Sequence, residues 1–234
     1  MKRYEIAGLQ VDMDVSGQTA LRAAPYETEA KGPADILLTC DDQQILDLNP
    51  HLQSLDMAQY MGTGRYFFQA LLQFEGLYLH SSAVMLDGKA YLFSAPSGTG
   101  KSTHTEKWCR LFGATYINDD KPVLRCHEGV WIAYGTPWSG KHDLSHPAGY
   151  PVGGIAFVHR GEENTLERLQ PAQALSRFLS QSLWKLGNKD EMAQQLQLVG
   201  DLLTKVPVWK LTCNRDDAAA HVARQGMQGG QLCK

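Results

Sequence analysis

The feature that most constrains this chain is the glycine-rich stretch APSGTGKS, residues 95–102, which stands between an apolar run and a segment of helical spacing. Gly98 and Gly100 permit a backbone whose successive N–H groups point at one anion, Lys101 brings a positive charge, and Ser102 offers a hydroxyl to Mg²⁺. Ala95 stands where such loops usually begin with glycine. The stretch therefore predicts a phosphate-binding loop, and the residues expected to hold the nucleotide ATP are Ala95, Pro96, Ser97, Gly98, Thr99, Gly100, Lys101, Ser102 and Thr103.

The segments around this loop predict the layout of an α/β core. Two apolar runs meet at Asp87-Gly88, a strong hairpin signal, and the second run leads straight into the loop. Residues 103–112 follow as a helix closed by Gly113, and "TYIN" then predicts a strand that ends at Asp119-Asp120.

Three further residues are candidates for chemistry near the loop. A carboxylate of Asp119 or Asp120 could bind Mg²⁺, and the other could accept the proton of an attacking hydroxyl, although the same pair could be a polar turn. Their spacing does not assign the two roles. His80 lies in an apolar run, where it could be catalytic or a hydrogen-bonded strand residue.

The stretch from Leu79 to Leu124 resembles the catalytic domain of the HPr kinase/phosphorylases, which share a nucleotide-binding core with phosphoenolpyruvate carboxykinases. The resemblance rests on a strand histidine, a hairpin into the phosphate loop, a helix, and an Asp-Asp pair after the next strand. It covers roughly residues 77 to 160, about a third of the chain. We find no counterpart to that family's later acidic-Arg-Gly signature, so the resemblance does not extend to the reverse, phosphate-removing reaction.

The resemblance implies a role for each matching residue. Asp120 would take the proton of the acceptor hydroxyl, Asp119 and Ser102 would lie at the metal, Lys101 would contact the outer phosphates, and His80 would lie beside the carboxylates. In place of the missing signature stands the long polar loop GTPWSGKHD, in which Lys141 could neutralise the transferring phosphoryl group or be a solvated lysine. Trp138 in that loop could stack on a ligand or pack in the core.

The pattern predicts three parts and a mixed-sheet α/β fold with α+β character. Residues 1–75 are expected to be a small strand-rich portion plus a helix broken at Gly62 and Gly64, and 76–225 the kinase-like core. Apolar residues at helical spacing predict helices near the C-terminus; they are Leu175, Phe178, Leu179, Leu183 and Leu186, then Met192, Leu196, Val199, Leu203 and Val206. A strand "VPVWKLTC", a short helix over 216–224 and a frayed tail over 226–234 complete the chain.

Composition limits the partners. The formal charge of −3 predicts no nucleic-acid partner. The sequence has no apolar run after Met1 and no stretch of 18 apolar residues, so it predicts neither a secretion signal nor a membrane span. Five scattered cysteines, Cys40, Cys109, Cys126, Cys213 and Cys233, predict reduced thiols and a cytoplasmic protein rather than disulfides or a zinc site. The family's members assemble into rings, which leaves a homo-oligomer open.

Together these features predict an ATP- and Mg²⁺-dependent kinase that transfers a γ-phosphoryl group to a hydroxyl acceptor. The acceptor would be a Ser or Thr of a protein or peptide, or a small hydroxylated metabolite; the family favours the former. The alternatives are a nucleotide-binding sensor or scaffold, and an NTPase without a phosphoacceptor.

Overall fold

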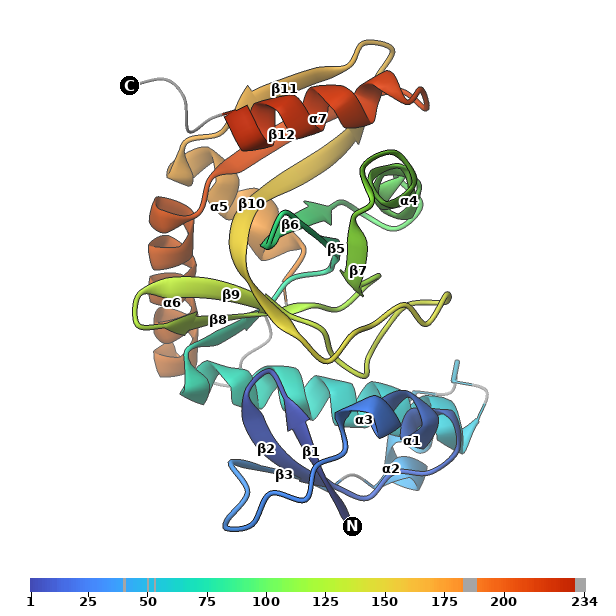
Figure 1. The fold of residues 1–234 in the computed structure, drawn as a ribbon. Coiled ribbons are helices and arrows are strands. Elements are labelled where there is room, and N and C mark those ends of the chain that lie inside the picture. The colour runs from blue at the N-terminus through green and yellow to red at the C-terminus, as the bar shows by residue number, and fades with distance from the viewer. Residues whose placement is uncertain (40, 50, 53, 183–188, 230–234) are drawn as a thin grey trace.

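The computed structural model describes residues 1–39, 41–49, 51–52, 54–182 and 189–229, and Figure 1 shows their arrangement. Within them the chain forms a three-stranded sheet near the N-terminus and a nine-stranded mixed sheet, with helices on both faces of the larger sheet. The mixed α/β fold predicted from the sequence is therefore confirmed.

The N-terminal part combines the small sheet with three helices. Its elements are β1 (Lys2–Ile6), β2 (Leu9–Met13), α1 (Gly17–Ala23), the 3₁₀ helix η1 (Ala24–Tyr26), β3 (Ile36–Leu38), α2 (Asp42–Leu48), α3 (Leu55–Ala70) and the 3₁₀ helix η2 (Leu71–Phe74). The sequence predicted a strand-rich portion with turns up to about residue 50 and did not predict the helices α1 and α2. Both are seven-residue helices, too short for a clear apolar period. The side chain of Asp41 begins α2 by accepting a hydrogen bond from Gln44 N at 3.0 Å.

Helix α3 is continuous, and the predicted break at Gly62 and Gly64 is wrong. Both glycines are buried. A Cβ built on Gly64 would lie 2.8 Å from Trp138 Cδ1, so this glycine allows the indole to lie directly against the helix backbone. The sequence shows a helix-weakening residue here, whereas the fold uses it for close packing.

The larger sheet contains the remaining strands. The elements are β4 (Gly76–Tyr78), β5 (Ser81–Leu86), β6 (Lys89–Ser94), α4 (Lys101–Phe112), β7 (Thr115–Asn118), β8 (Val123–His127), β9 (Val130–Tyr134), β10 (Gly149–Arg160), β11 (Thr165–Arg168), α5 (Pro171–Ser180), α6 (Lys189–Lys205), β12 (Val208–Cys213) and α7 (Ala218–Gly229). The strand order is β4-β8-β9-β10-β6-β5-β7, with β12 also beside β10 and β11 beside β12. Strand β10 is antiparallel to β9 but parallel to β6 and β12, so it joins the two halves of the sheet.

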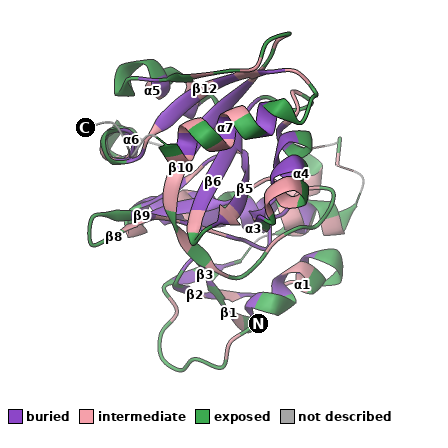
Figure 2. Cartoon of the chain, turned by 45° about the horizontal axis from the view of Figure 1, so that its top comes forward, coloured by how far each residue is buried: buried purple, intermediate pink, exposed green. Residues whose placement is uncertain are grey.

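Alternating side chains of the central strands build two cores. Leu92 faces the α5 and α6 side with Phe178, whereas Tyr91 and Phe93 face the α4 and α7 side with Trp108. Figure 2 shows buried residues along the central strands and exposed residues on the outer faces of these helices. The larger sheet is thus covered on both faces, as a partly parallel sheet requires.

The C-terminal helices differ from the sequence prediction in two places. The predictions for Leu183, Leu186 and residues 230–234 fall outside the described residues. Met192 and Leu196 are exposed at 41% and 38%, so only part of the α6 stripe is core. The predicted frayed tail is wrong up to Gly229, because α7 continues past Gly226 and buries Met227.

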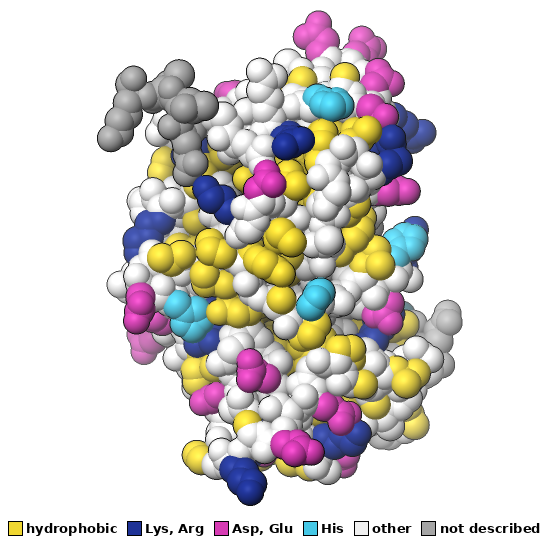
Figure 3. Space-filling view, viewed as in Figure 1, with side chains coloured by type: hydrophobic (Ala, Val, Ile, Leu, Met, Phe, Trp, Pro, Cys, Tyr) yellow, Lys and Arg dark blue, Asp and Glu magenta, His cyan; other side chains and the backbone are white. Residues whose placement is uncertain are grey.

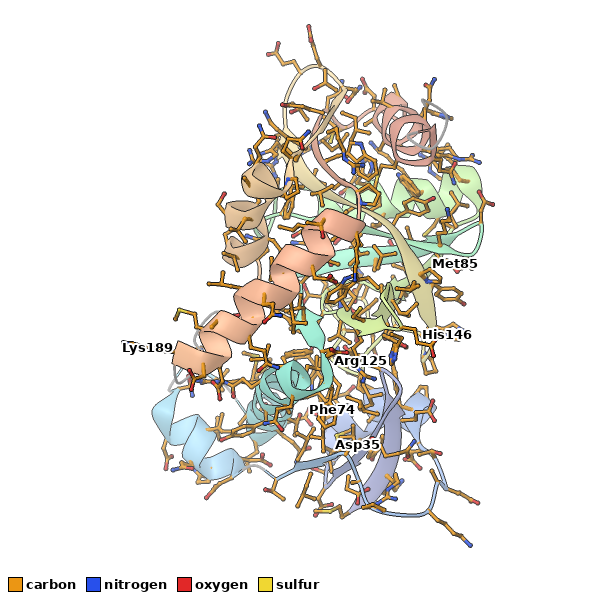
Figure 4. All side chains as sticks on the ribbon, turned by 90° about the vertical axis from the view of Figure 1, so that its left-hand side faces the viewer. Asp35, Phe74, Met85, Arg125, His146 and Lys189 are labelled. Atoms are coloured by element: carbon orange, nitrogen blue, oxygen red, sulfur yellow. The ribbon has the colours of Figure 1, made fainter. Side chains whose placement is uncertain are left out.

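The two sheets are joined by a shared core and by Arg125. The guanidinium of Arg125 on β8 donates to Phe74 O at 3.1 Å and to Ala7 O at 2.7 Å, and Figure 4 shows Arg125 close to Phe74, above the N-terminal sheet. The apolar core of the small sheet includes Phe67 of α3 and Trp138 of the long loop. The N-terminal part is therefore packed against the loop that follows β9. No described helix is long and apolar enough to cross a membrane.

Candidate active site

The candidate site forms at one edge of the larger sheet, where β6 and β7 end and β5 begins. Strand β5 lies between the other two and is antiparallel to both, with Ser81 opposite Ser94 and Ala83 opposite Asn118. The segment before β5, the loop after β6 and the Asp-Asp pair after β7 therefore meet at this edge. Ser94 Oγ donates to His80 O at 2.8 Å, and Ser81 N donates to Asp120 O at 3.2 Å, which ties the segments together.

The phosphate-type loop takes the backbone its glycines predict. Gly98 has φ 76° and Gly100 has φ 125°, and a Cβ on either would meet no atom within 4 Å. Backbone conformation, not lack of space, is what requires glycine here. Lys101 Nζ is buried and donates to Ala95 O at 2.8 Å. Burial lowers the pKa of Lys101, while the negative charge of Asp120 opposes that shift, so the two groups interact across the site.

Arg160, at the end of β10, supports the loop from the other side. Its Nε donates to Thr99 O at 3.2 Å, and its Nη2 donates to Gly98 O. A polar hollow of about 610 Å³ opens between this arginine, the loop and the first turns of α4, where Thr103 is exposed. Helix α4 begins at Lys101, two residues before the predicted start, so its N-terminal dipole lies at the loop.

Asn118 fixes the turn that carries the two carboxylates. Its Oδ1 accepts hydrogen bonds from Asp120 N at 2.9 Å and Lys121 N at 2.6 Å, while its Nδ2 donates to Thr136 O at 3.0 Å. Asn118 is fully buried. The orientation of the pair is therefore set by a short polar network rather than by a solvated turn.

Asp119 and Asp120 have different environments. Asp119 is buried, and its Oδ1 accepts a hydrogen bond from Gly140 N at 2.5 Å, which ties the long loop to the strand end. Burial raises the pKa of Asp119, although hydrogen bonds from the backbone of Gly140 and His142 oppose the shift. Asp119 thus positions the loop as well as lying at the site.

Asp120 lies between two nitrogen donors. His80 Nε2 is 3.0 Å from Asp120 Oδ1, and Lys121 Nζ contacts Oδ2. Burial by itself would raise the pKa of Asp120, but the hydrogen bond from His80 and the charge of Lys121 outweigh it, so the pKa is well below its usual range. His80 is held in turn by Gln181, whose Oε1 is 3.2 Å from Nδ1. Asp120 is consequently an ionised, oriented carboxylate at neutral pH.

A hollow of about 380 Å³ opens beside Asp120, and much of its wall comes from the N-terminal part. We call it the acceptor-side hollow; the residues used below are Thr19 and Arg22 of α1, Tyr60 of α3, and Lys121 and Lys141. Thr19 Oγ1 is buried and has no hydrogen-bond partner among the described residues. Arg22 Nε lies 3.2 Å from Asp143 Oδ1, and its guanidinium stacks over the Tyr60 ring at 5.1 Å.

The structure brings together part of the predicted set. His80 and Asp120 are in contact, Lys101 and Asp120 interact electrostatically, and Lys141 lines the same hollow as Asp120. Ser102 is exposed on the first turn of α4. Among the described residues, no group of three or more His, Cys, Asp or Glu side chains is arranged to hold a metal ion.

Sequence reasoning missed Lys121, Arg160 and the N-terminal wall. Lys121 directly follows the predicted Asp-Asp pair, and Arg160 ends a predicted strand, so a cation at the carboxyl end of a strand was the available signal for both. Nothing in the sequence pointed to Thr19, because only the folded chain places α1 beside Asp120. Trp138 packs in the core at 1% exposure, which was the second of its two predicted roles.

Comparisons with known proteins find a matching family model and distant structural matches. The family model described as "SynChlorMet cassette protein ScmC" matches residues 46–217. No curated protein matches this chain. Among solved structures, the Hpr(Ser) kinase/phosphatase from Coxiella burnetii aligns with a TM-score of 0.39 and 10% identity, over 66% of this chain and 98% of that chain.

Proposed function

This chain belongs to the SynChlorMet cassette protein ScmC family, and for this member we propose the activity of an ATP-dependent kinase that transfers a γ-phosphoryl group to a hydroxyl acceptor. The observation that carries the proposal is Asp120. Its carboxylate is held between His80 and Lys121, at the sheet edge where the glycine-rich loop follows β6. Asp120 also lines the acceptor-side hollow. A protein that only binds a nucleotide has no need for such a carboxylate.

The proposed reaction is an in-line displacement. The acceptor hydroxyl oxygen forms a bond to the γ-phosphorus while the bond from that phosphorus to the bridging oxygen breaks, and its electron pair leaves with ADP. The proton of the hydroxyl passes to the carboxylate of Asp120. Because the pKa of Asp120 is low, the carboxylate orients the hydroxyl first and receives the proton late, as suits a loose transition state.

The other residues would bind and stabilise charge. Backbone N–H groups of residues 95–103 and the start of α4 would hold the phosphates, and Lys101 would move from Ala95 O to the outer ones. Lys141 and Lys121 would neutralise charge on the transferring group from the acceptor side.

Ser102 and Asp119 would hold the magnesium ion that the proposed reaction uses. Ser102 offers an exposed hydroxyl and Asp119 a carboxylate, and such oxygen ligands are those Mg²⁺ prefers. Bound there, Mg²⁺ would supply charge neutralisation at the phosphates.

Labelled ATP with Mg²⁺, offered to Ser- and Thr-containing peptides and to hydroxylated metabolites, tests the proposal. Asp120→Asn should lower transfer by about 100-fold or more while leaving nucleotide affinity within about twofold, since it removes a proton acceptor but no phosphate contact. Asp217→Asn is the matched control, because Asp217 is an exposed carboxylate paired with Arg110 and should leave transfer unchanged.

Each alternative has its own result. Transfer that persists in Asp120→Asn would remove Asp120 as the base. Hydrolysis without transfer to any acceptor would indicate an NTPase, and binding without turnover would indicate a sensor or scaffold.

A further inference from the structure

A second hollow, of about 420 Å³, adjoins the acceptor-side hollow between α2, α3 and the loop that carries Trp138. We call it the aromatic hollow; its principal lining residues are Ile45, Tyr60, Met61, Phe68, Tyr78 and Trp138. Its volume is within the range of sites that enclose a whole small ligand, and its lining is mostly apolar. The proposed transfer reaction assigns it no role.

The walls of the aromatic hollow are held in place by one another. Trp138 stacks on Phe67 with ring centroids 4.8 Å apart and meets Phe68 edge-on at 5.5 Å. Its Nε1 donates to Thr63 Oγ1 at 3.1 Å, and Phe68 packs on Tyr78 at 4.6 Å. Rings fixed by several partners form a pocket without rearrangement, so little ordering entropy opposes binding there.

Two residues connect this hollow to the proposed base. Tyr60 and Lys121 line both hollows, and Lys121 Nζ lies 3.3 Å from Tyr60 OH while also contacting Asp120. Tyr78 lines the aromatic hollow and also a smaller opening beside His80 and Asp120. Only the side chain of Lys121 therefore separates a ligand group bound in the aromatic hollow from an acceptor hydroxyl bound at Asp120.

Exposed apolar side chains of α1 and α3 lie both inside and outside the two hollows. Met61 and Tyr66 line the aromatic hollow, Met57 lines the acceptor-side hollow, and Leu21 and Leu55 line neither. Leu21 is exposed at 66%, Leu55 at 53%, Met57 at 47%, Met61 at 46% and Tyr66 at 47%. Figure 3 shows hydrophobic side chains on the lower right of the molecule, where Figure 1 places α1 and α2.

We propose, on the premise of the kinase activity above, that the acceptor is a polypeptide segment with a large apolar or aromatic residue within about three positions of its Ser or Thr. The apolar side chain enters the aromatic hollow while the hydroxyl reaches Asp120. Each hollow has the volume of a complete small-molecule site, so a compact metabolite would fill one hollow and leave the other empty.

The test uses the full chain and synthetic peptides of Gly, Asn and Lys with a single Ser. One set carries Trp at each of the three positions before and after Ser, and the matched set carries Ala. The best Trp position should raise kcat/KM at least about tenfold over Ala, the effect expected for burial of one large side chain. Met61→Trp should reduce that preference to about threefold or less by filling the hollow. Met192→Trp, a matched exposed methionine on α6, should leave it intact. Ile45→Trp is the second blocking variant should Met61→Trp misfold.

Failure of this inference is distinguishable from failure of the kinase proposal. Peptide phosphorylation with no preference for Trp, or a preference that survives both blocking variants, overturns the inference and leaves the kinase. Peptide binding without phosphoryl transfer is measured separately. The best Trp peptide is made with Ala in place of Ser and labelled with fluorescein, and its binding is followed by fluorescence anisotropy. Binding that Met61→Trp weakens, with no transfer to any peptide or hydroxylated metabolite, supports the hollow and removes the kinase. Absence of both binding and phosphorylation of peptides overturns the inference.

Discussion

Replacing Gly64 with alanine separates two opposing effects that the structure allows us to compare. In an exposed helix interior, alanine is about 0.5–1 kcal/mol more favourable than glycine, because glycine loses more backbone entropy on folding. At Gly64, however, the added Cβ would lie 2.8 Å from Trp138 Cδ1 and 3.1 Å from its Cγ and Nε1. The indole is 1% exposed and cannot move into solvent without leaving its partners.

The packing effect should win. Overpacking a well-filled core costs about 1–3 kcal/mol. A displaced indole would also weaken its hydrogen bond to Thr63, worth about 1 kcal/mol. Subtracting the helix-propensity gain, we expect Gly64→Ala to lower the free energy of unfolding by about 1–3 kcal/mol, or the melting temperature by roughly 2–12 °C.

Gly200→Ala provides the matched control. Gly200 is exposed within α6, and a Cβ there would meet no atom within 4 Å. The same substitution should therefore stabilise the protein by about 0.5–1 kcal/mol. Urea unfolding at equilibrium, followed by tryptophan fluorescence and circular dichroism, measures both variants. If Gly64→Ala stabilises the fold as much as Gly200→Ala does, the close packing of Trp138 on α3 does not constrain the structure.

Three further predictions concern charge at and near the site. Arg160→Met removes the donors to Gly98 O and Thr99 O and should weaken binding of a fluorescent ATP analogue about tenfold; unchanged affinity would mean that the loop holds its shape alone. Lys121→Met removes a charge that lowers the pKa of Asp120, so that pKa should rise and the acid limb of the activity profile should move to higher pH; an unmoved limb would contradict the pairing. Burial lowers the pKa of His104 to about 3, below its usual value near 6.5. The unfolded state therefore binds more protons than the folded state, and the free energy of unfolding decreases as the pH is lowered. Between pH 6.5 and 5 the loss should be about 1.6 kcal/mol by urea unfolding, and His104→Phe should remove it; equal pH dependence in both proteins would show that His104 is not buried neutral.

The sequence predicted those parts of the site whose chemistry is local. The phosphate-type loop has two residues with positive φ, and both are glycine. Asp-Gly is a typical sequence of a two-residue hairpin turn, as at Asp87-Gly88. The strand that ends at Asp119-Asp120 is recognisable from its apolar residues and the polar pair after it. These features were found because each is encoded within about ten residues. Assignment of roles to the two carboxylates came only from resemblance, since both occupy the same turn.

The remaining features depend on contacts between distant segments. Gly64 was interpreted as a helix break because its partner, Trp138, lies more than seventy residues away in the sequence. Thr19 lies at the hollow beside Asp120 only because the fold places α1 there, far from Asp120 in the sequence. Short helices such as α1 have too few turns for a period to show, so the N-terminal part looked like strands and turns.

One chain of contacts links α3 to the proposed acceptor side. Trp138 packs on Gly64, the next residue, Ser139, accepts a hydrogen bond from Tyr60 OH, and Gly140 N donates to Asp119. Three consecutive residues of the long loop are thus held by α3 on one side and by the carboxylate turn on the other. Because Tyr60 also contacts Lys121, the position of α3 is coupled to the cation that keeps Asp120 ionised. Gly64→Ala should therefore change the preference for an apolar neighbour in the acceptor and the transfer rate together, whereas a substitution in a separate stability element such as α6 would change neither.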